Sequence, residues 1–262
     1  MKNVLVLLHD DRGLNSRVQV ALDLVRDLQG QLICLDLTIP IVAMGQDPLF
    51  CTMVLEPEVD TAVRVAAREH IEQSGVRFHW IERRGELTHE LTRASDLADI
   101  IVLSSTAGLM LPEMHSAIGS LLVKSRKTVV VVPTTAVGMP LNSEAMLLWD
   151  GSDGAHHAMM AAMPLFRHAT NVTIVEVDDG SITDSAVRAS TYLSQRSVRN
   201  TVRSAPAFGE RASTQLLEQL ALLKPAYAAM GAFGTSRLVE RLFGGVTERL
   251  VGQSPVPLLL AY

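Results

Sequence analysis

The chain has 262 residues, of which 48% are hydrophobic and 19% are charged, and its formal net charge is −5. This composition provides ample apolar side chains for buried cores, and the lack of a basic block argues against nucleic acid or an anionic membrane as the main partner. No apolar stretch approaches the roughly 20 residues that cross a bilayer. The apolar run at 4–8 is too short for a signal-peptide core, and Cys34 and Cys51 have no metal-like spacing. We therefore expect a soluble, cytoplasmic protein.

The first half alternates strand patterns with helix patterns. Residues 4–8 form a continuous apolar run, typical of a strand that is buried on both faces. Asn15 or Ser16 is placed to cap the following helix, which should end at Gly30. An irregular loop is expected after the second strand, around Pro40 and Pro48. The other expected elements are strands at 32–37, 76–81, 100–103 and 129–132 and helices at 56–74, at 87–97 and between the last two strands.

The second half repeats this order after a linker at 134–143, which contains Gly138 and Pro140. Its expected strands lie at 145–149, 172–177, 199–204, 227–230 and 256–260, and its expected helices at 155–168, 185–194, 211–223 and 246–251. Strands separated by helices indicate parallel strands joined by right-handed crossovers. We therefore predict two tandem α/β domains, 1–137 and 144–262, each a doubly wound, five-stranded parallel sheet.

The two halves also match residue by residue. Residues 98–107 align with 225–234 without a gap, and the same shift brings 129–132 onto 256–259. A register kept over about thirty residues favours an internal duplication. The alternative, that any two strand-helix-strand units look alike, stays open at this point.

The segment 231–247 contains the sequence feature that points most clearly to a ligand. It follows an apolar strand, it is rich in glycine, and it leads into an amphipathic helix. Glycines let backbone N–H groups approach a ligand closely, and the start of a helix favours phosphate. Asp150 ends the first strand of this half, so it should lie at the carboxyl ends of the strands, on the same rim of the sheet as the glycine segment. There it can accept hydrogen bonds from a ribose or a base. Neither a Walker loop nor a Gly-x-Gly-x-x-Gly fingerprint occurs here.

Gly231, Gly234 and Gly244 form a Gly-x2-Gly-x9-Gly pattern that, together with Asp150, resembles the ATP-binding signature of the universal stress protein family. The resemblance covers the second half and, through the order of strands and helices, extends over the first. It implies that Gly231 and Gly234 line the ribose and phosphates of ATP or a related adenine nucleotide, with or without Mg²⁺. It also implies that Gly244 and Gly245 hold the terminal phosphates.

By the same resemblance, Asp150 contacts the adenosine and the main chain around Val177 meets adenine. One position departs from the family pattern. The family has Ser or Thr directly after the third glycine, whereas this chain has Gly245. The backbone donor remains but the hydroxyl is lost, which makes contact with a γ-phosphate an open question. Three nearby hydroxyl groups are possible substitutes: those of Thr235, Ser236 and Thr247.

The first half lacks this pattern. Ser104, Ala107 and Ala117 stand where the second half has its three glycines, and each adds a Cβ that penalises positive φ. We therefore predict a degenerate copy with a structural or regulatory role. Two features leave an alternative open, namely Gly119-Ser120 and the polar cluster of His9, Asp10 and Asp11, whose register with Asp150 is ambiguous.

Other residues favour simpler interpretations. His156 and His157 are adjacent on a helix, so they point about 100° apart and do not form a two-ligand face. We expect them to be solvated or to pack, and we expect Met159, Met160 and Met163 to lie in the helix core. Arg237 and Arg241, within the glycine segment, could steer phosphates or could be ordinary solvated charges.

The resemblance favours a stress-response protein that senses an adenine nucleotide through its second half, with at most weak ATP hydrolysis. A nucleotide-independent interaction or scaffold protein is the alternative. An adenylyl-transferring or ATP-hydrolysing enzyme is a third possibility, but the sequence shows no added catalytic signature. Closing strands commonly pair subunits in the family, so 129–132 and 256–260 are expected to meet edge to edge as an internal pseudo-dimer. A homodimer and an unidentified protein partner also stay open.

Overall fold

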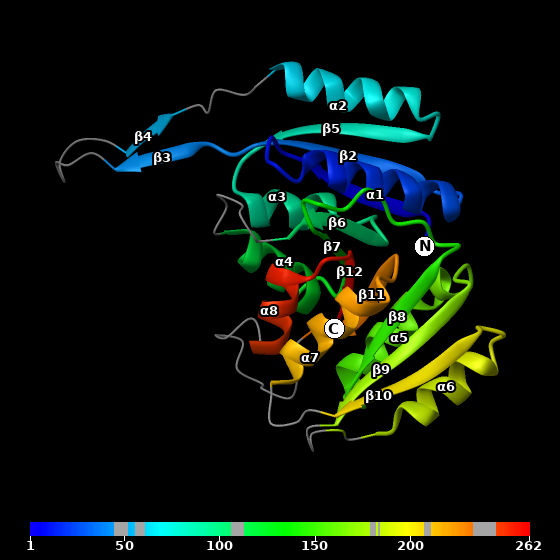
Figure 1. Ribbon diagram of the computed structural model, residues 1–262. Helices are drawn as coiled ribbons and strands as arrows, with labels where there is room; N and C mark the ends of the chain where they lie inside the picture. The colour runs from blue at the N-terminus through cyan, green and yellow to red at the C-terminus, as the bar shows by residue number, and fades with distance from the viewer. Residues whose placement is uncertain are drawn as a thin grey trace.

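The computed structural model describes residues 1–44, 52–55, 61–105, 113–178, 182, 184–206, 211–232 and 245–262, and it describes the side chains of all of these except 41–44, 52–55, 61, 178 and 206. Strands and helices alternate within each half, except that three strands follow one another between 31 and 55 (Figure 1). No helix in these residues is long and apolar enough to cross a membrane.

Ten strands form one continuous sheet in the order β10-β9-β8-β11-β12-β7-β6-β1-β2-β5. Each half contributes five strands, and within each half every neighbouring pair is parallel. The predicted α/β class with two doubly wound units is therefore confirmed. The strands of the first half are β1 (Asn3–Leu8), β2 (Gln31–Thr38), β5 (Phe78–Arg84), β6 (Ile100–Ser104) and β7 (Thr128–Val132). Those of the second half are β8 (Glu144–Trp149), β9 (Asn171–Asp178), β10 (Asn200–Pro206), β11 (Tyr227–Gly231) and β12 (Leu258–Ala261).

Helices cover both faces of the sheet, and each layer contains helices from both halves. Side chains alternate between the faces of a strand, so Val4 and Val6 pack in one core while Leu5 and Leu7 pack in the other. The first core is covered by α1 (Leu14–Asp27), α2 (Thr61–Gln73), α5 (Asp153–Phe166) and α6 (Ala186–Ser194). The second is covered by α3 (Leu87–Ala94), α4 (Glu113–Val123), α7 (Ala212–Leu223) and α8 (Gly245–Gln253).

The halves join through their closing strands. Strands β7 and β12 pair antiparallel, with Val130 opposite Leu259, which confirms that these strands meet edge to edge. The strands are parallel within each half and antiparallel across this junction. The carboxyl ends of the first half's strands therefore lie at one end of the strand direction, and those of the second half's strands lie at the opposite end. Any ligand rim of one half is therefore remote from the rim of the other.

Helix α1 holds the segment that links the halves. The Asp23 carboxylate accepts a hydrogen bond from the Met139 N–H, and the Asp27 carboxylate accepts one from the Leu141 N–H, both at 2.8 Å. The side chains of Met139 and Leu141 are fully buried. The segment 133–143 contains no helix or strand, as expected of a linker, while the domain limits of 137 and 144 stay predictions.

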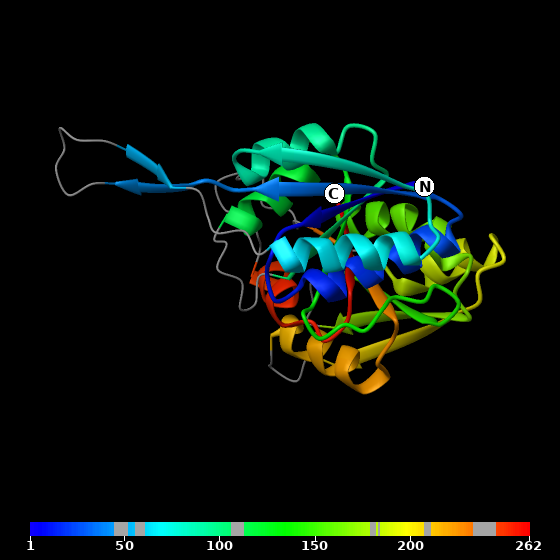
Figure 2. The same cartoon turned by 90° about the horizontal axis from the view of Figure 1, so that it is seen from above.

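Two local predictions were wrong. Helix α1 begins at Leu14 after Gly13, without a side-chain cap, and the Ser16 hydroxyl instead donates to the carbonyl oxygen of Thr134. The expected loop after β2 contains an antiparallel pair, β3 (Ile41–Met44) and β4 (Thr52–Leu55), which projects from the body of the molecule (Figures 1 and 2). Helix α2 is first described at Thr61, and 56–60 lie outside the described residues.

Candidate functional site

The carboxyl edge of the second-half sheet brings together three of the predicted site residues. Asp150 directly follows β8, and Gly231 is the last residue of the neighbouring strand β11. On the other side of β8, Trp149 pairs with Glu176 of β9, so Val177 lies level with Asp150. These positions agree with the rim that the sequence predicts, and the binding roles of the three residues stay predictions.

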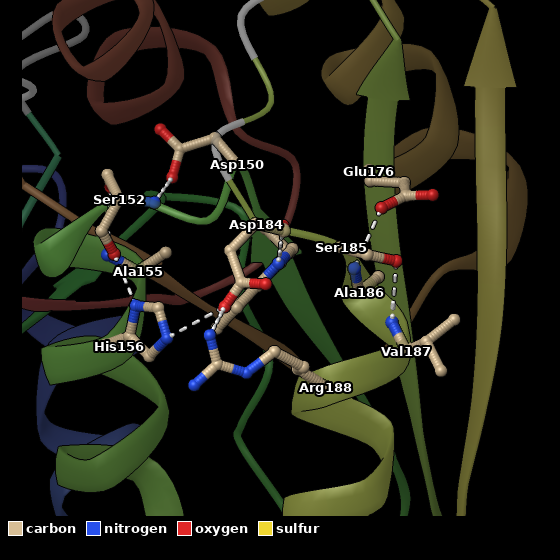
Figure 3. Close-up of polar contacts among 11 residues, drawn as sticks. Asp150, Ser152, Ala155, His156, Glu176, Asp184, Ser185, Ala186, Val187 and Arg188 are labelled. Carbon is tan, nitrogen blue, oxygen red and sulfur yellow. Dashed lines mark hydrogen bonds and ion pairs between the residues drawn. The ribbon is translucent and has the colours of Figure 1, made fainter.

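Asp150 begins a tight turn into helix α5. Its Oδ1 accepts a hydrogen bond from the Ser152 N–H at 2.9 Å, and Gly151 between them has φ +76°. Ser152 caps the helix, since its hydroxyl accepts from the Ala155 N–H at 3.2 Å (Figure 3). This turn holds the exposed Asp150 at the start of a helix, on the solvent side of the rim.

Gly231 is a glycine because helix α5 lies directly against it. A Cβ at this position would lie 2.7 Å from the backbone nitrogen of Ala155 and closer still to the carbonyl carbon of Gly154. Real Cβ atoms do not approach backbone that closely, so any other residue would displace the helix or the strand. The glycine therefore fixes the end of β11 beside the first turn of α5.

Gly245 is different, because nothing crowds it. It is the exposed first residue of α8, and among the described residues no heavy atom lies within 4 Å of a Cβ built there. The loss of the family's Ser or Thr is therefore not forced by space. Thr247, one of the considered substitutes, is buried at 5% exposure. Gly234 and Gly244 lie outside the described residues, as do Thr235, Ser236, Arg237 and Arg241.

Asp184, which the sequence analysis did not single out, connects the Asp150 turn to α6. Its carbonyl oxygen accepts from Trp149 Nε1 at 2.8 Å. Its backbone also crowds Gly151, because a Cβ there would lie 2.6 Å from the carbonyl oxygen of Asp184. The Asp184 carboxylate lies 2.8 Å from Arg188 Nη1 and 3.5 Å from His156 Nε2 (Figure 3). No sequence motif marks Asp184, since its partners lie in other elements.

The histidines and methionines of α5 only partly follow the sequence analysis. His156 packs edge-on against Trp149, with ring centroids 4.7 Å apart, and its Nδ1 lies 2.9 Å from the carbonyl oxygen of Ser152. Met159 and Met163 are buried in the core as predicted, but Met160 is 52% exposed, so its core assignment was wrong. Across the described part of the chain, no group of three His, Cys, Asp or Glu side chains is arranged to hold a metal ion.

The strand pairing settles which first-half residues correspond to the rim. Val4 pairs with Ile100 as Ala145 pairs with Tyr227. Counting along the strands from these pairs places His9 at the position of Asp150 and Ser104 at the position of Gly231. The ambiguity between His9 and its two acidic neighbours is thereby resolved in favour of His9.

In the first half, a crevice is expected where β1 and β6 end side by side. It is filled by the side chain of Arg17, which is fully buried. Its Nε donates to the carbonyl oxygen of Leu7 at 2.6 Å, and its Nη2 donates to that of His9 at 3.0 Å. Its Nη1 donates to the Asp11 carboxylate at 3.0 and 3.1 Å and to the Ser104 hydroxyl. The guanidinium thus joins the ends of β1 and β6, the two strands that frame the crevice.

Sequence reasoning missed Arg17, although a signal was present. On α1, Arg17 lies three residues after Leu14 and three before Val20, on the apolar face of the helix. A charge on a buried face needs partners, and these come from the loop after β1 and from the end of β6. Burial lowers the pKa of Arg17, and the Asp11 carboxylate opposes that shift.

Comparison with known proteins supports the fold. No family model matches the sequence, and no curated protein matches it either. A universal stress protein from Archaeoglobus fulgidus DSM 4304 superimposes with a TM-score of 0.71 at 16% identity, covering 99% of this chain and 95% of that one. A functionally unknown protein from Pseudomonas aeruginosa PAO1 gives 0.62 at 10% identity, with 99% and 92% covered.

The cytoplasmic domain of a prokaryotic cation chloride cotransporter gives a TM-score of 0.56 at 13% identity, covering 99% of this chain and 94% of that one. These identities are too low to carry an activity from one protein to another. They do cover both halves of the chain in a single superposition. The chain therefore has the tandem two-domain fold of universal stress proteins.

Proposed function

We propose that this chain is a cytoplasmic stress-response protein that binds ATP or a related adenine nucleotide through its second half and acts as a sensor or regulator. The observation that carries the proposal is the contrast between two equivalent rims. In the first half, Arg17 and Ser104 fill the crevice. In the second, the end of β8 presents an exposed Asp150, and Gly231, packed against α5 at the end of β11, has no side chain to fill the crevice.

The chemistry of the second rim suits a nucleotide. The Asp150 carboxylate can accept hydrogen bonds from ribose hydroxyl groups, and the main chain around Val177 lies level with it to meet a base. Helix α8 begins at Gly245 on the segment that follows β11. The first N–H groups of a helix have no partner within the helix, so they favour phosphate. Gly234 and Gly244 belong to this proposed site on motif grounds alone.

We expect a single nucleotide per chain. A second one in the first half would have to displace the Arg17 guanidinium from two carbonyl oxygens, a carboxylate and a hydroxyl. Leaving such buried polar groups without partners costs ~1–3 kcal/mol for each group. The first half then serves as a structural unit that completes the ten-stranded sheet.

The proposed role is regulatory rather than catalytic, with at most weak ATP hydrolysis. Nucleotide bound at this rim would change the surface offered to a protein partner. Mg²⁺ would accompany the phosphates if a triphosphate is the ligand. The internal pairing of β7 with β12 already uses the edges through which two separate domains could pair, so a homodimer would need another surface.

Calorimetric titration of the nucleotide-stripped protein with Mg-ATP tests this proposal. We expect one binding event per chain, which Gly234→Asp abolishes by placing a carboxylate beside the phosphates. Gly75→Asp is the matched control, because Gly75 lies in open space in the first half; it should leave binding intact. No heat at millimolar nucleotide from a folded protein would contradict the proposal, and two equal sites would contradict the role given to Arg17.

A nucleotide-independent interaction protein is the second candidate. Gly245 favours it, because the hydroxyl of the family signature is missing although space for it exists. The similarity to the cytoplasmic domain of a cotransporter shows that this fold also occurs as a domain of a larger assembly. If calorimetric titration with nucleotide produced no heat, we would propose this second function instead.

A further inference from the structure

A cavity of about 270 Å³ lies between helices α5 and α6, beside the last residue of β8. Its lining residues come from the end of β8 and from the two helices, so it lies beside the proposed nucleotide rim and under these helices. Asp150, Gly231 and Gly245 do not line it. The side chains that matter for its chemistry are those of Trp149, His156, Met159, Arg188, Tyr192 and Gln195.

The wall of this cavity is aromatic and apolar. Trp149 is 3% exposed and meets His156 edge-on, with the ring planes 64° apart. Met159 is buried beside them, and Tyr192 closes the side formed by α6. Aromatic edges and a thioether sulfur both interact favourably with a flat ring. The wall therefore fits the body of a small aromatic molecule.

The wall is also fixed in place before any ligand arrives. Trp149 Nε1 donates to the carbonyl oxygen of Asp184, and the His156 ring is held at Nδ1 by the carbonyl oxygen of Ser152. The Tyr192 hydroxyl donates to Met160 Sδ at 2.7 Å. Binding to such a wall needs little ordering of side chains, and that lowers the free-energy cost of association.

One end of the cavity carries an arginine that is paired with a carboxylate. Arg188 lies on α6, and its side chain is 77% exposed. Within the described residues its ion pair is with Asp184, through Nη1 at 2.8 Å. Since a guanidinium has five N–H donors, its planar fork keeps donors for a carboxylate. Arg196 adds a second charge nearby, with its guanidinium carbon 3.5 Å from the centroid of the Tyr192 ring.

We propose that this cavity is a second small-molecule site and that it binds a small aromatic carboxylate. The ring lies against Trp149 and Tyr192, and the carboxylate pairs with Arg188. The volume is just below the ~300 Å³ at which pockets for drug-sized ligands begin, which suits a molecule of one or two rings. This inference does not depend on nucleotide binding.

Fluorescence of Trp149 gives a direct test. The chain has two tryptophans, and Trp80→Phe leaves Trp149 as the sole reporter. Titration with benzoate should change its emission saturably, while benzamide, the neutral molecule of the same shape, should bind about two- to fivefold more weakly, because the pair with the exposed Arg188 is a weak one. No saturable change in a folded protein, or equal responses to benzoate and benzamide, would overturn the proposal.

Three variants in the Trp80→Phe background separate this site from its surroundings. Arg188→Gln should weaken benzoate binding by about two- to fivefold, the range of an exposed ion pair, while Arg167→Gln, on an exposed arginine at the end of α5, should not. Asp150→Asn should also leave benzoate binding unchanged, since it alters the nucleotide rim but keeps an oxygen for the Ser152 N–H. Unchanged binding in Arg188→Gln, or loss in Asp150→Asn, would contradict a separate site.

Discussion

Arg17 and Asp11 form an ion pair inside the first half, with Arg17 Nη1 3.0 Å from Asp11 Oδ2 and the side chains 0% and 9% exposed. Removing one member of a buried pair leaves the other charge without compensation, at a cost of ~3–5 kcal/mol. We therefore expect Arg17→Met to lower the free energy of unfolding by about 3 kcal/mol or more, measured by denaturant titration.

Arg26→Met is the matched control for this substitution. Arg26 lies on the same helix and pairs with Asp23 at 3.7 Å, but its side chain is 46% exposed. Exposed pairs contribute ~0–1 kcal/mol, so this variant should lose less than about 1 kcal/mol. The double variant Arg17→Met/Asp11→Asn should lose less than the sum of the two single changes. Equal losses in Arg17→Met and Arg26→Met would show that the buried pair does not hold the crevice closed.

Gly151 and Gly75 separate backbone strain from steric conflict. Both have positive φ, +76° and +71°, and alanine in that region costs ~1–2 kcal/mol. A Cβ on Gly75 meets no atom within 4 Å, whereas one on Gly151 enters the backbone of Asp184. Gly151→Ala should therefore destabilise the fold by at least about 1 kcal/mol more than Gly75→Ala, as thermal and denaturant unfolding can measure. Similar losses would mean that the backbone of Asp184 yields to the added methyl group.

The strands and most helices could be predicted because their signals are local. Apolar runs mark strands buried on both faces, and the gap-free alignment of the two halves places β6 (Ile100–Ser104) onto β11 (Tyr227–Gly231). The hairpin of β3 and β4 was missed because Pro40 and Pro48 suggested a loop. The cap of α1 was assigned wrongly because Ser16 finds its partner in the linker at Thr134, over a hundred residues away.

The site could be predicted only as far as a motif describes it. Asp150, Val177 and Gly231 were predicted to share a rim because parallel strands end on one side of the sheet and because the chain resembles the family, and their binding roles stay predictions. The partners of Arg17 and of Asp184 were not found, since each set includes a side chain from an element distant in sequence, Ser104 for Arg17 and His156 for Asp184. The sequence also does not show that a Cβ would fit at Gly245 and would not fit at Gly231. Both results depend on which atoms of other elements lie beside the glycine.

His9, which occupies the position of Asp150 in the first half, gives the fold a pH dependence. Burial lowers the pKa of His9 from its ordinary value of 6.5, although the Asp11 carboxylate acts in the opposite direction. The histidine of the unfolded chain therefore binds protons at higher pH than the folded one. Its contribution to stability is present above that ordinary pKa and is lost as the pH falls from there toward the lower folded value.

We expect the free energy of unfolding to fall between about pH 7.5 and about pH 5.5, and His9→Gln should reduce this fall. Glutamine can still donate to the backbone of Leu37, as His9 does. Denaturant titrations at the two pH values measure the difference. His157→Gln, on an exposed histidine of α5, should leave the pH dependence unchanged. An unaltered fall in His9→Gln would assign the effect to other groups.

Gly245 allows the family signature to be restored in this chain. Its Cβ would meet no atom within 4 Å, so Gly245→Ser places a hydroxyl at the start of α8 without steric cost. If phosphates lie there, a hydrogen bond to a charged oxygen contributes ~1.5–3 kcal/mol, which corresponds to about tenfold tighter binding of Mg-ATP or more. Gly245→Ala adds the same Cβ without the hydroxyl, and calorimetry should find its affinity close to that of the parent. A gain in Gly245→Ser over Gly245→Ala would place the terminal phosphates at the start of α8, whereas equal affinities would place them elsewhere on the rim.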